Sequence, residues 1–577
     1  MKHIVSRSRH TQQIPLIRPG GDLVTGVKSN QTLQLGDLER HAVETTRKRM
    51  KLIMVLFVLI FAALGGRLIQ LNTGDEMHAR HQAEKNNKAN LTRPMIVDRN
   101  GVLLATNIQA YTLGADARLI DDAETVTQKL AHIIPDLNQS RTRHYLATTR
   151  HHIKLKHGVT PRQYHAVLEL GNPGLKMELS QERVYPHGAS ASHVVGFVND
   201  DKKGLRGLER ALDEALVMAD ERAHVQTTLD IRVQHAVRAE LQKGVERFAA
   251  IGGAALVMDV TNGDILAMVS LPDFDPNHPT LVPEASRFNR NTQGLYEVGS
   301  IFKIFTAAMA LESKAVSVEQ KFQTSEPLLI GKHTIEDDHG QERPLTTHEI
   351  VTYSSNVGSA QLALSVPPDV HRAFFERLGL MNRPFFDLPE TTDPQLPAYW
   401  SDIHRVTISY GYGMNVSPLQ VVAAGAAMVN GGIYYEPRLV ANGSPLGVSV
   451  ISDETSKYMR EMMRDVVVSG TASQGDVVGY PVLGKTGTAE KQRSGGYAED
   501  ANISSFFGAF PAHKPRYAFI VMLDEPQIID STPRNTAGWN AVPVSARIVE
   551  RIAPLLGLMP LNQDERLRLA RFEGEGL

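Results

Sequence analysis

Two residues with catalytic potential, Ser300 and Lys303, lie three positions apart at the start of an almost wholly apolar run, "LYEVGSIFKIFTAAMALE". Residues three apart share one face of a helix, so the hydroxyl of Ser300 and the amine of Lys303 can be neighbours. A serine becomes a good nucleophile when a base accepts its proton, and apolar surroundings lower the pKa of a lysine until it can be that base. Isoleucines and phenylalanines surround this lysine, and Gly299 allows close backbone approach. The pattern predicts a serine nucleophile with a lysine base.

A second motif with polar side chains follows in "YSSNVG", which contains Ser354 and Asn356. It comes directly after Thr346-x-x-Glu349, a capping box that predicts the start of a helix. A chain of this length should contain about two Ser-x-x-Lys pairs by chance. The interpretation of Ser300 and Lys303 therefore depends on the motifs that accompany them.

The third motif is "LGKTGTAEK", with Lys485, Thr486, Gly487 and Thr488 leading into a β-rich segment. A lysine with two hydroxyls can bind a carboxylate, and a glycine permits a substrate to lie against the edge of a strand. Each motif alone is most often a turn, a cap or a strand end. All three in this order, each on the element that its role requires, favour one composite active site.

The order Ser-x-x-Lys, Ser-x-Asn, Lys-Thr-Gly resembles the signature of penicillin-binding proteins and serine β-lactamases. Longer blocks, among them "AALVMDVTNGDILAMVSLPDFDPN", "ISYGYGMNVSPLQVVAAGAAMVNGG", "RPMIVDRNGVLLATN" and "QTTLDIRVQ", are similar to the class B penicillin-binding proteins. These are single-span membrane transpeptidases of peptidoglycan synthesis. The block from Gly484 to Pro526 looks like that of the septal, division-specific type, often called penicillin-binding protein 3. The resemblance runs from Leu52 to about Gly557.

The resemblance implies roles for four catalytic residues. Ser300 would attack the carbonyl of the penultimate D-Ala in a stem peptide and form an acyl-enzyme, with Lys303 as its base. Ser354 would carry the proton to the leaving amine, and Asn356 would bind the peptide amide of the substrate. β-Lactams resemble the donor peptide and would acylate Ser300.

The same resemblance implies a substrate-binding group on the Lys-Thr-Gly block. Lys485, Thr486 and Thr488 would bind the terminal carboxylate, beside Gly487. The backbone N–H groups of Ser300 and Thr488 would form an oxyanion hole. The mechanism needs no metal and no organic cofactor, and the 22 histidines show no metal-ligand spacing.

Departures from the family pattern fall outside the three motifs. Pro94 stands where the family usually has Gly, Val298 replaces a common Pro, and Ser417 replaces a frequent Thr. These three substitutions affect the expected local backbone geometry and the assignment to a subgroup of the class B penicillin-binding proteins.

Three alternatives to the septal transpeptidase remain at this stage. An elongation-specific class B transpeptidase shares every motif. A serine β-lactamase shares the triplet but is normally a small soluble enzyme, and no Glu-bearing block for a deacylating water is visible. A penicillin sensor or a divisome scaffold without activity would not need all the catalytic residues, and the sensor would usually need a larger cytoplasmic module.

Composition limits the classes of partner and of chemistry that the protein can use. The formal net charge is -2 over 577 residues, which argues against binding to nucleic acid through overall charge. There is no cysteine, which excludes thiolate nucleophiles and disulfides. By resemblance, the partners are peptidoglycan stem peptides, β-lactams, a polytopic septal glycosyltransferase and other divisome membrane proteins.

A membrane span is predicted near the N-terminus. Fifteen residues from Leu52 to Gly66 have no polar side chain, and the basic flank "RKRMK" ends at Lys51. About 20 helical residues, 52–71, cross the roughly 30 Å core of a bilayer. By the positive-inside rule the tail before them stays cytoplasmic and about 500 residues lie outside. We expect a single-pass protein of the inner membrane whose catalytic domain is periplasmic and which acts at the division septum.

The expected organisation is multidomain. It comprises a disordered cytoplasmic tail (1–46), a transmembrane helix (47–71), an α+β pedestal of the non-catalytic, dimerisation type (72–235), a transpeptidase domain (236–557) and a C-terminal tail (558–577). The transpeptidase domain is expected to be α+β, an antiparallel sheet flanked by helices, like other penicillin-binding proteins and serine β-lactamases.

Local patterns predict several elements. Asp98 to Gly101 and Thr261 to Asp264 read as the turns of two hairpins, and "SPLQVVAAGAAMV" as a helix capped by Ser417. Residues 120–180 look mainly helical and basic. Two β-rich runs surround the turn near Pro515.

Overall fold

The computed structural model describes residues 50–67, 93–213, 224–338, 340–441, 443–493, 496–529 and 534–565. The chain divides into two compact units, residues 1–90 and 91–577. In the first unit the described residues form one fully exposed helix, Met50–Arg67, which is long and apolar enough to cross a membrane. The predicted apolar helix is confirmed. The predicted cytoplasmic tail, both ends of the predicted span and the polar segment after it lie outside the described residues.

The first part of the second unit, which we call the pedestal (93–213 and 224–230), is built on a five-stranded sheet. Its order is β3-β2-β1-β7, and β4 also pairs with β2. The strands are β1 Met95–Val97, β2 Leu103–Ala115, β3 Ile153–Val159, β4 Leu175–Val184 and β7 His224–Gln226. The predicted turn is present, since Gly101 N donates to Asp98 O between β1 and β2.

The helices of the pedestal pack on β2. They are α2 Ala123–Ile133, α3 Gln139–Leu146 and α4 Pro161–Glu169. The prediction that residues 120–180 are mainly helical is wrong for β3 and the start of β4. Both strands contain a short apolar–polar alternation, "IKL" in β3 and "LKMEL" in β4, which the helical prediction did not use, and both pair with β2.

A buried ionic cluster lies at the base of the pedestal. Glu209, on the short helix α6 Gly207–Ala211, is 0% exposed and accepts hydrogen bonds from Arg93 at 2.8 Å and Arg183 at 2.7 Å. Arg93 also pairs with Asp213. The pedestal also contains the short elements η1 Ala117–Leu119, η2 Gly188–Ala191, α5 Ser192–Val195, β5 Phe197–Val198 and β6 Gly204–Arg206.

The C-terminal domain contains an antiparallel sheet in the order β16-β17-β18-β8-β9. Its strands are β8 Gly252–Asp259, β9 Ile265–Leu271, β16 Leu483–Arg493, β17 Gly496–Phe510 and β18 Tyr517–Asp524. The predicted hairpin at Thr261 to Asp264 and the paired runs around Pro515 are confirmed.

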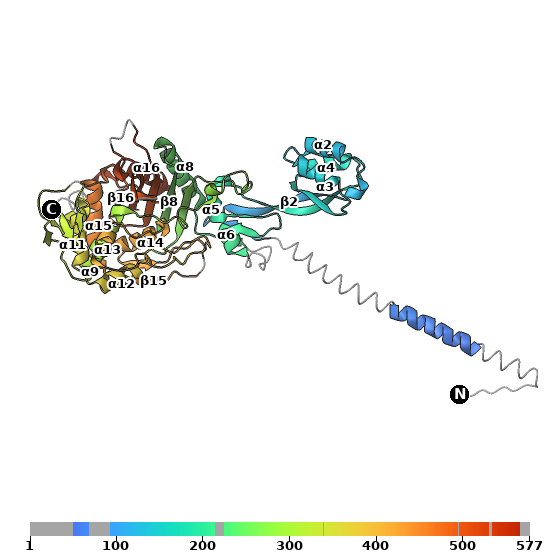
Figure 1. Cartoon of the computed structure of the whole chain (residues 1–577), viewed down its shortest axis with the longest axis horizontal. Helices are drawn as coiled ribbons and strands as arrows, with labels where there is room; N and C mark the ends of the chain where they lie inside the picture. The colour runs from blue at the N-terminus through green and yellow to red at the C-terminus, as the bar shows by residue number, and fades with distance from the viewer. Residues whose placement is uncertain are drawn as a thin grey trace, which may run out of the picture. The chain divides into compact units, whose positions relative to one another are not determined.

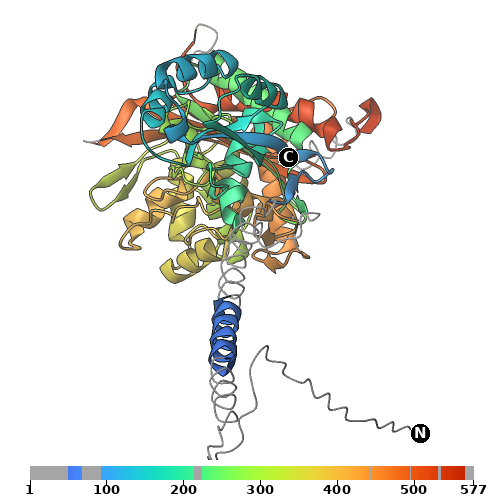
Figure 2. The ribbon, with the colours of Figure 1, turned by 90° about the vertical axis from the view of Figure 1, so that its right-hand side faces the viewer.

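Helices cover both faces of this sheet (Figures 1 and 2). On one face lie α8 Ile231–Arg247 and α16 Ala541–Leu555, and on the other lies α14 Pro418–Val429. Neighbouring residues of β17 show the two faces. The ring of Phe506 lies on the side of α16, and that of Phe507 packs against Gly425 of α14. The α+β prediction for this domain is confirmed.

A group of helices stands beside the first strand, β16. It comprises α9 Phe302–Glu312, α10 Thr347–Thr352, α11 Asn356–Leu364, α12 Pro368–Arg377, α13 Asp402–Ser409 and α15 Asp453–Val468. Two predicted capping boxes are present, Thr346 with Glu349 at α10 and Ser417 with Gln420 at α14. Small strand pairs connect the helices: β10 Lys321–Phe322 with β13 Leu345–Thr346, β11 Leu328–Ile330 with β12 His333–Ile335, and β14 Ile433–Tyr435 with β15 Gly447–Ser449. Four 3-10 turns, η3 Glu284–Arg287, η4 Gly299–Ile301, η5 Ser473–Gly475 and η6 Ala537–Trp539, complete the domain.

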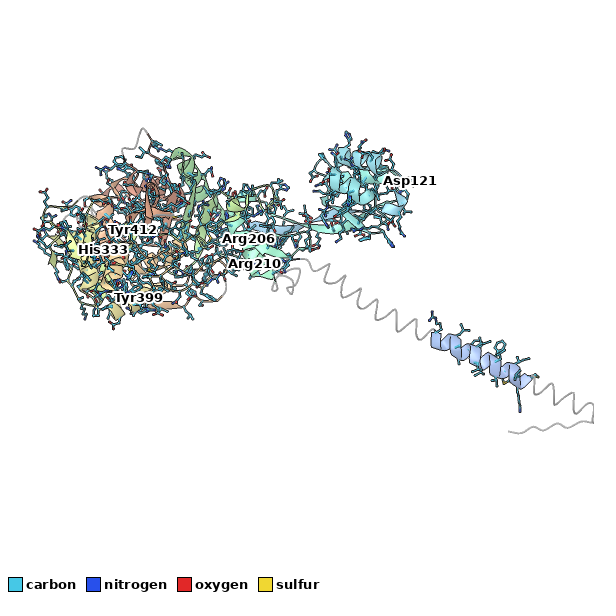
Figure 3. The ribbon with its side chains drawn as sticks, viewed as in Figure 1. Asp121, Arg206, Arg210, His333, Tyr399 and Tyr412 are labelled. Carbon is cyan, nitrogen blue, oxygen red and sulfur yellow. The ribbon has the colours of Figure 1, made fainter. Side chains whose placement is uncertain are left out.

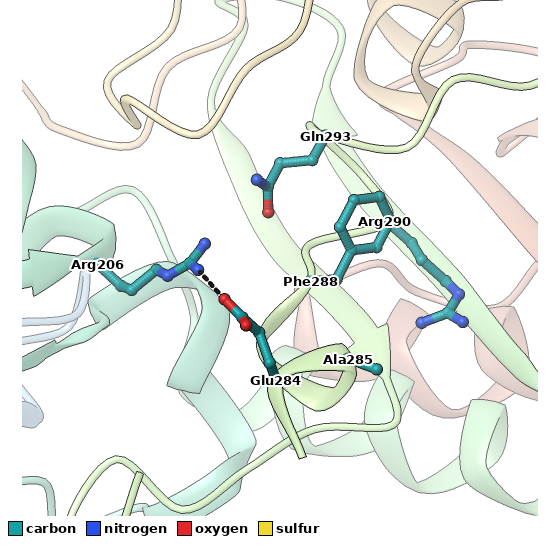
Figure 4. A pocket seen from close by; sticks show the side chains of 6 residues that line it. All are labelled: Arg206, Glu284, Ala285, Phe288, Arg290 and Gln293. Atoms are coloured by element: carbon teal, nitrogen blue, oxygen red, sulfur yellow. Dashed lines mark ion pairs between the residues drawn. The ribbon is translucent and has the colours of Figure 1, made fainter. Parts of the chain in front are cut away.

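Polar contacts join the base of the pedestal to the C-terminal domain. The side chain of Asn277 accepts from Tyr185 N and donates to Tyr185 O, both at 3.0 Å. A cavity of about 450 Å³ lies next to this junction, where Arg206 of β6 pairs with Glu284 at 3.7 Å (Figure 4). Figure 3 places Arg206 and Arg210 on the pedestal side.

Candidate functional site

The turn that carries Ser300 packs directly against β16. Gly299 adopts a φ of +56°, and a side chain there would lie 2.6 Å from Thr488 O. A side chain at Gly487 would lie 2.1 Å from Val298 O. Glycine is required at both positions, because the two backbones touch. The backbone of the turn that carries Ser300 therefore fills the space next to Gly487.

Ser300 belongs to η4, and α9 follows at once, so Lys303 lies in its first turn. Lys303 is 1% exposed, whereas Ser300 is partly exposed. Among the described residues none forms a hydrogen bond with the side chain of Ser300. The structure therefore places the two residues on consecutive turns, and the amine of Lys303 forms its hydrogen bonds with residues other than Ser300.

The amine of Lys303 contacts the second motif. Its Nζ donates to Ser354 Oγ at 3.1 Å, to Asn356 Oδ1 at 2.7 Å and to the carbonyl of Ser354. Burial lowers the pKa of Lys303 to about 7, and the charges of Asp337 and Asp338 oppose this shift. Both the amine and the ammonium are populated near neutral pH, so Lys303 can accept a proton and return it.

Ser354 stands between two lysines. Its Oγ accepts from Lys303 and, at 3.0 Å, from Lys485 of β16. Its φ of +62° is a left-handed conformation, in the link between α10 and α11. One hydroxyl thus connects all three sequence motifs.

The Lys-Thr-Gly-Thr block occupies β16, an edge strand of the sheet. Lys485 is fully buried, and burial lowers its pKa well below the ordinary value, with a further contribution from the charge of Lys303. Thr486 Oγ1 lies 2.6 Å from Thr471 Oγ1, and Thr488 Oγ1 accepts from Ala537 N at 3.0 Å. The strand therefore places the buried amine of Lys485 and the hydroxyls of Thr486 and Thr488 near the turn that carries Ser300.

Sequence reasoning missed several residues that support this arrangement. Glu297, 5% exposed, accepts from Gly413 N at 2.6 Å and from the hydroxyl of Tyr497 at 3.2 Å. Asp337, after β12, accepts from backbone amides of the second motif. Glu297 could have been suspected from its place three residues before Ser300, whereas Asp337 lies in a polar loop that gives no local signal. Tyr412 and His333, labelled in Figure 3, mark the segments that carry Gly413 and Asp337.

A metal site has no support in this region. In the ranges that the structure describes, no group of three or more His, Asp or Glu side chains could bind a metal ion. The chemistry available is that of a hydroxyl, two buried amines, an amide and backbone N–H groups.

Comparison with known proteins agrees with the geometry. Residues 253–550 match the family described as penicillin binding protein transpeptidase domain, and residues 88–240 match the penicillin-binding protein dimerisation domain. The chain is 37% identical over 479 residues to a probable peptidoglycan D,D-transpeptidase FtsI of Caulobacter vibrioides, which covers 80% of this chain and 81% of that protein. It is 28% identical to the peptidoglycan D,D-transpeptidase FtsI of Escherichia coli, over 84% of this chain and 87% of that one.

A solved structure shares the fold. The crystal structure of a peptidoglycan synthetase from Bifidobacterium adolescentis aligns with a TM-score of 0.64 at 22% identity, covering 82% of this chain and 96% of that one. The sheet flanked by helices, with its three converging motifs, defines a serine enzyme of the acyl-transfer class. The chain belongs to the class B penicillin-binding proteins, with a dimerisation domain followed by a transpeptidase domain.

Proposed function

We propose that this protein is a peptidoglycan D,D-transpeptidase that cross-links stem peptides during septal cell-wall synthesis. The observation that carries the proposal is the hydroxyl of Ser354, which accepts hydrogen bonds from Lys303 and Lys485 at once. This contact brings the three motifs into one site beside Ser300. The names of the two FtsI relatives and the family match support the reaction class.

In the first half of the reaction, Ser300 Oγ attacks the carbonyl carbon of the penultimate D-Ala, and its proton passes to Lys303. The C–N bond to the terminal D-Ala breaks. Ser354 passes a proton to the leaving amine and takes one from Lys303, and the acyl group stays on Ser300 as an ester. The N–H groups of Ser300 and Thr488 stabilise the oxyanion, because the glycine contacts fix the turn of Ser300 against β16.

In the second half, an amine of a neighbouring stem peptide attacks the ester carbonyl and gives up a proton to Lys303. The C–O bond to Ser300 then breaks, and Ser300 Oγ takes the proton back. Asn356 binds the donor's peptide amide. Lys485, Thr486 and Thr488 bind the donor's terminal carboxylate before it leaves, and Gly487 keeps the strand close to the nucleophile turn. β-Lactams enter the same site and acylate Ser300.

Labelling of the full chain with a fluorescent penicillin tests this assignment. We expect Ser300→Ala to abolish labelling, whereas Ser313→Ala, an exposed serine at the far end of α9, should label like the wild type. Equal labelling of Ser300→Ala would overturn the assignment. Rapid release of the label by hydrolysis would favour a β-lactamase instead.

The septal role, the partners and the location belong to the same proposal. The block after Lys-Thr-Gly resembles the septal type, and two relatives are named FtsI. We propose contacts with a polytopic glycosyltransferase and other divisome membrane proteins through the span and the pedestal. Depletion of the protein should give filamentous cells, and rounded cells would indicate the elongation role.

We also propose the predicted boundaries as functional ones: a pedestal to residue 235 and a transpeptidase domain from residue 236 to 557. Helix α8 begins at Ile231 and packs against α16 and the large sheet. The proposed boundary after residue 235 therefore assigns the first turn of α8 to the pedestal segment. The single apolar helix supports membrane anchoring, with the transpeptidase domain in the periplasm.

A further inference from the structure

Asp337 contacts three successive residues of the second motif, although it lies outside every motif found in the sequence. Its Oδ2 accepts from Ser355 Oγ at 2.6 Å. Its Oδ1 accepts from Val357 N at 3.0 Å and also from Asn356 N. One carboxylate thus satisfies the first two amides of α11, which have no partner within the helix.

These contacts bear on the conformation of Ser354. A non-glycine residue with a φ of +62° is strained and persists only where its surroundings over-determine its conformation. Lys303 and Lys485 donate hydrogen bonds to Ser354, and Asp337 accepts hydrogen bonds from the three residues that follow it. Without Asp337, the turn between α10 and α11 would lose the acceptor that anchors it to the loop after β12.

Asp337 also brings negative charge to a site with two buried lysines. The charged groups that face Lys303 are Lys485 from β16, and Asp337 and Asp338 from the segment after β12. Of the two acids, Asp337 has the larger effect on Lys303, and Asp338 is exposed. Asp337 therefore combines contact with the motif and charge beside its base.

We propose that Asp337 is a positioning residue for acyl transfer, which keeps Ser354 and Asn356 in register with Lys303 and supplies the counter-charge to the buried lysine pair. The inference rests on the proposed function, because it assigns Asp337 a part in that same site. Asp337 acts through Lys303 and Ser354 and does not itself touch the reacting atoms.

Two substitutions separate the contacts from the charge. Asp337→Asn keeps an oxygen acceptor for the amides and an amide group that can bond Ser355 Oγ, but it removes the charge. Asp337→Ala removes both. Asp338→Asn is the matched control, since it removes the same charge one residue further on without the three contacts to the motif.

The experiment measures the rate of acylation of the full chain in detergent by a fluorescent penicillin, between about pH 5 and pH 9. Loss of a neighbouring negative charge lowers the pKa of Lys303, so the acid limb of Asp337→Asn should move to lower pH by roughly 1 unit. Asp338→Asn should move it less. Asp337→Ala should lower the plateau roughly 10-fold to 100-fold, because misplaced groups lose rate steeply.

An acid limb that stays in place in Asp337→Asn overturns the proposal, as does a wild-type plateau in Asp337→Ala. Thermal unfolding shows whether Asp337→Ala is folded, and if it is not, Asp337→Asn decides alone. A purely structural residue would lower the rate without moving the limb. Failure of the proposed function looks different, since the wild type would then not be acylated at Ser300 at all.

Discussion

At the scale of single residues, the site depends on two lysines that burial makes less basic than usual. Lys303 is 1% exposed and Lys485 is 0% exposed. Both donate to Ser354 Oγ, and the charge of Lys303 disfavours the charged form of Lys485. Desolvation is the larger cause of the lowered pKa values. Burial around α9 disfavours the ammonium form of Lys303 and leaves an amine that can accept a proton.

The pH dependence of acylation tests this view of Lys303. Because its pKa is lowered to about 7, the neutral amine is lost below that pH, and the acylation rate should fall as pH decreases through 7. Lys303→Arg keeps a positive charge but remains protonated throughout, so we expect it to lose at least about 100-fold in rate. Kinetics of penicillin acylation measure both effects.

A flat profile through neutral pH in the wild type would contradict the assignment of Lys303 as the base. Substitution of an exposed lysine on the same segment, Lys314→Arg, serves as the control and should leave the profile unchanged.

At the scale of elements, buried polar groups connect parts of the chain that are remote in sequence. Glu209 of α6 joins Arg93, which precedes β1, to Arg183 at the end of β4. Two guanidinium groups share one fully buried carboxylate. Its removal takes away the ion pair of Arg183 and leaves Arg93 paired with Asp213 alone.

We predict that Glu209→Ala destabilises the protein by about 3–5 kcal/mol, because it removes the buried ion pair of Arg183 and leaves Arg93 paired with Asp213 alone. The matched control is Glu284→Ala, where the carboxylate is 81% exposed and pairs with Arg206 at 3.7 Å. That exposed pair should contribute less than about 1 kcal/mol. Thermal unfolding of the full chain in detergent compares the two, and equal midpoints would contradict the prediction.

At the scale of the whole molecule, the helix Met50–Arg67 and the second compact unit, residues 91–577, require different surroundings. The helix is apolar along its length and exposed, which suits lipid. The second unit buries its apolar side chains in its own core.

The proposed orientation can be measured with reporters fused to the C-terminus. A periplasmic reporter such as alkaline phosphatase should be active and a cytoplasmic reporter inactive, because the basic flank "RKRMK" keeps the N-terminal end inside. Replacement of its four basic residues by Gln should increase the inverted fraction, whereas the same number of changes among the distant residues 566–577 should not. An active cytoplasmic reporter on the wild type would contradict the orientation.

The sequence by itself determined the features that depend on neighbours along the chain. The two hairpin turns, the capping boxes at Thr346 and Ser417, the apolar helix and the three motifs are all local, because turn and cap chemistry acts over a few residues. Only the tertiary structure decided that Lys303 bonds to Ser354, 51 residues away, and that Lys485 reaches the same hydroxyl across 131 residues. It also decided the place of Asp337 and the strands β3 and β4. Polar loops and strands pair with segments distant in sequence, and no local pattern identifies those partners.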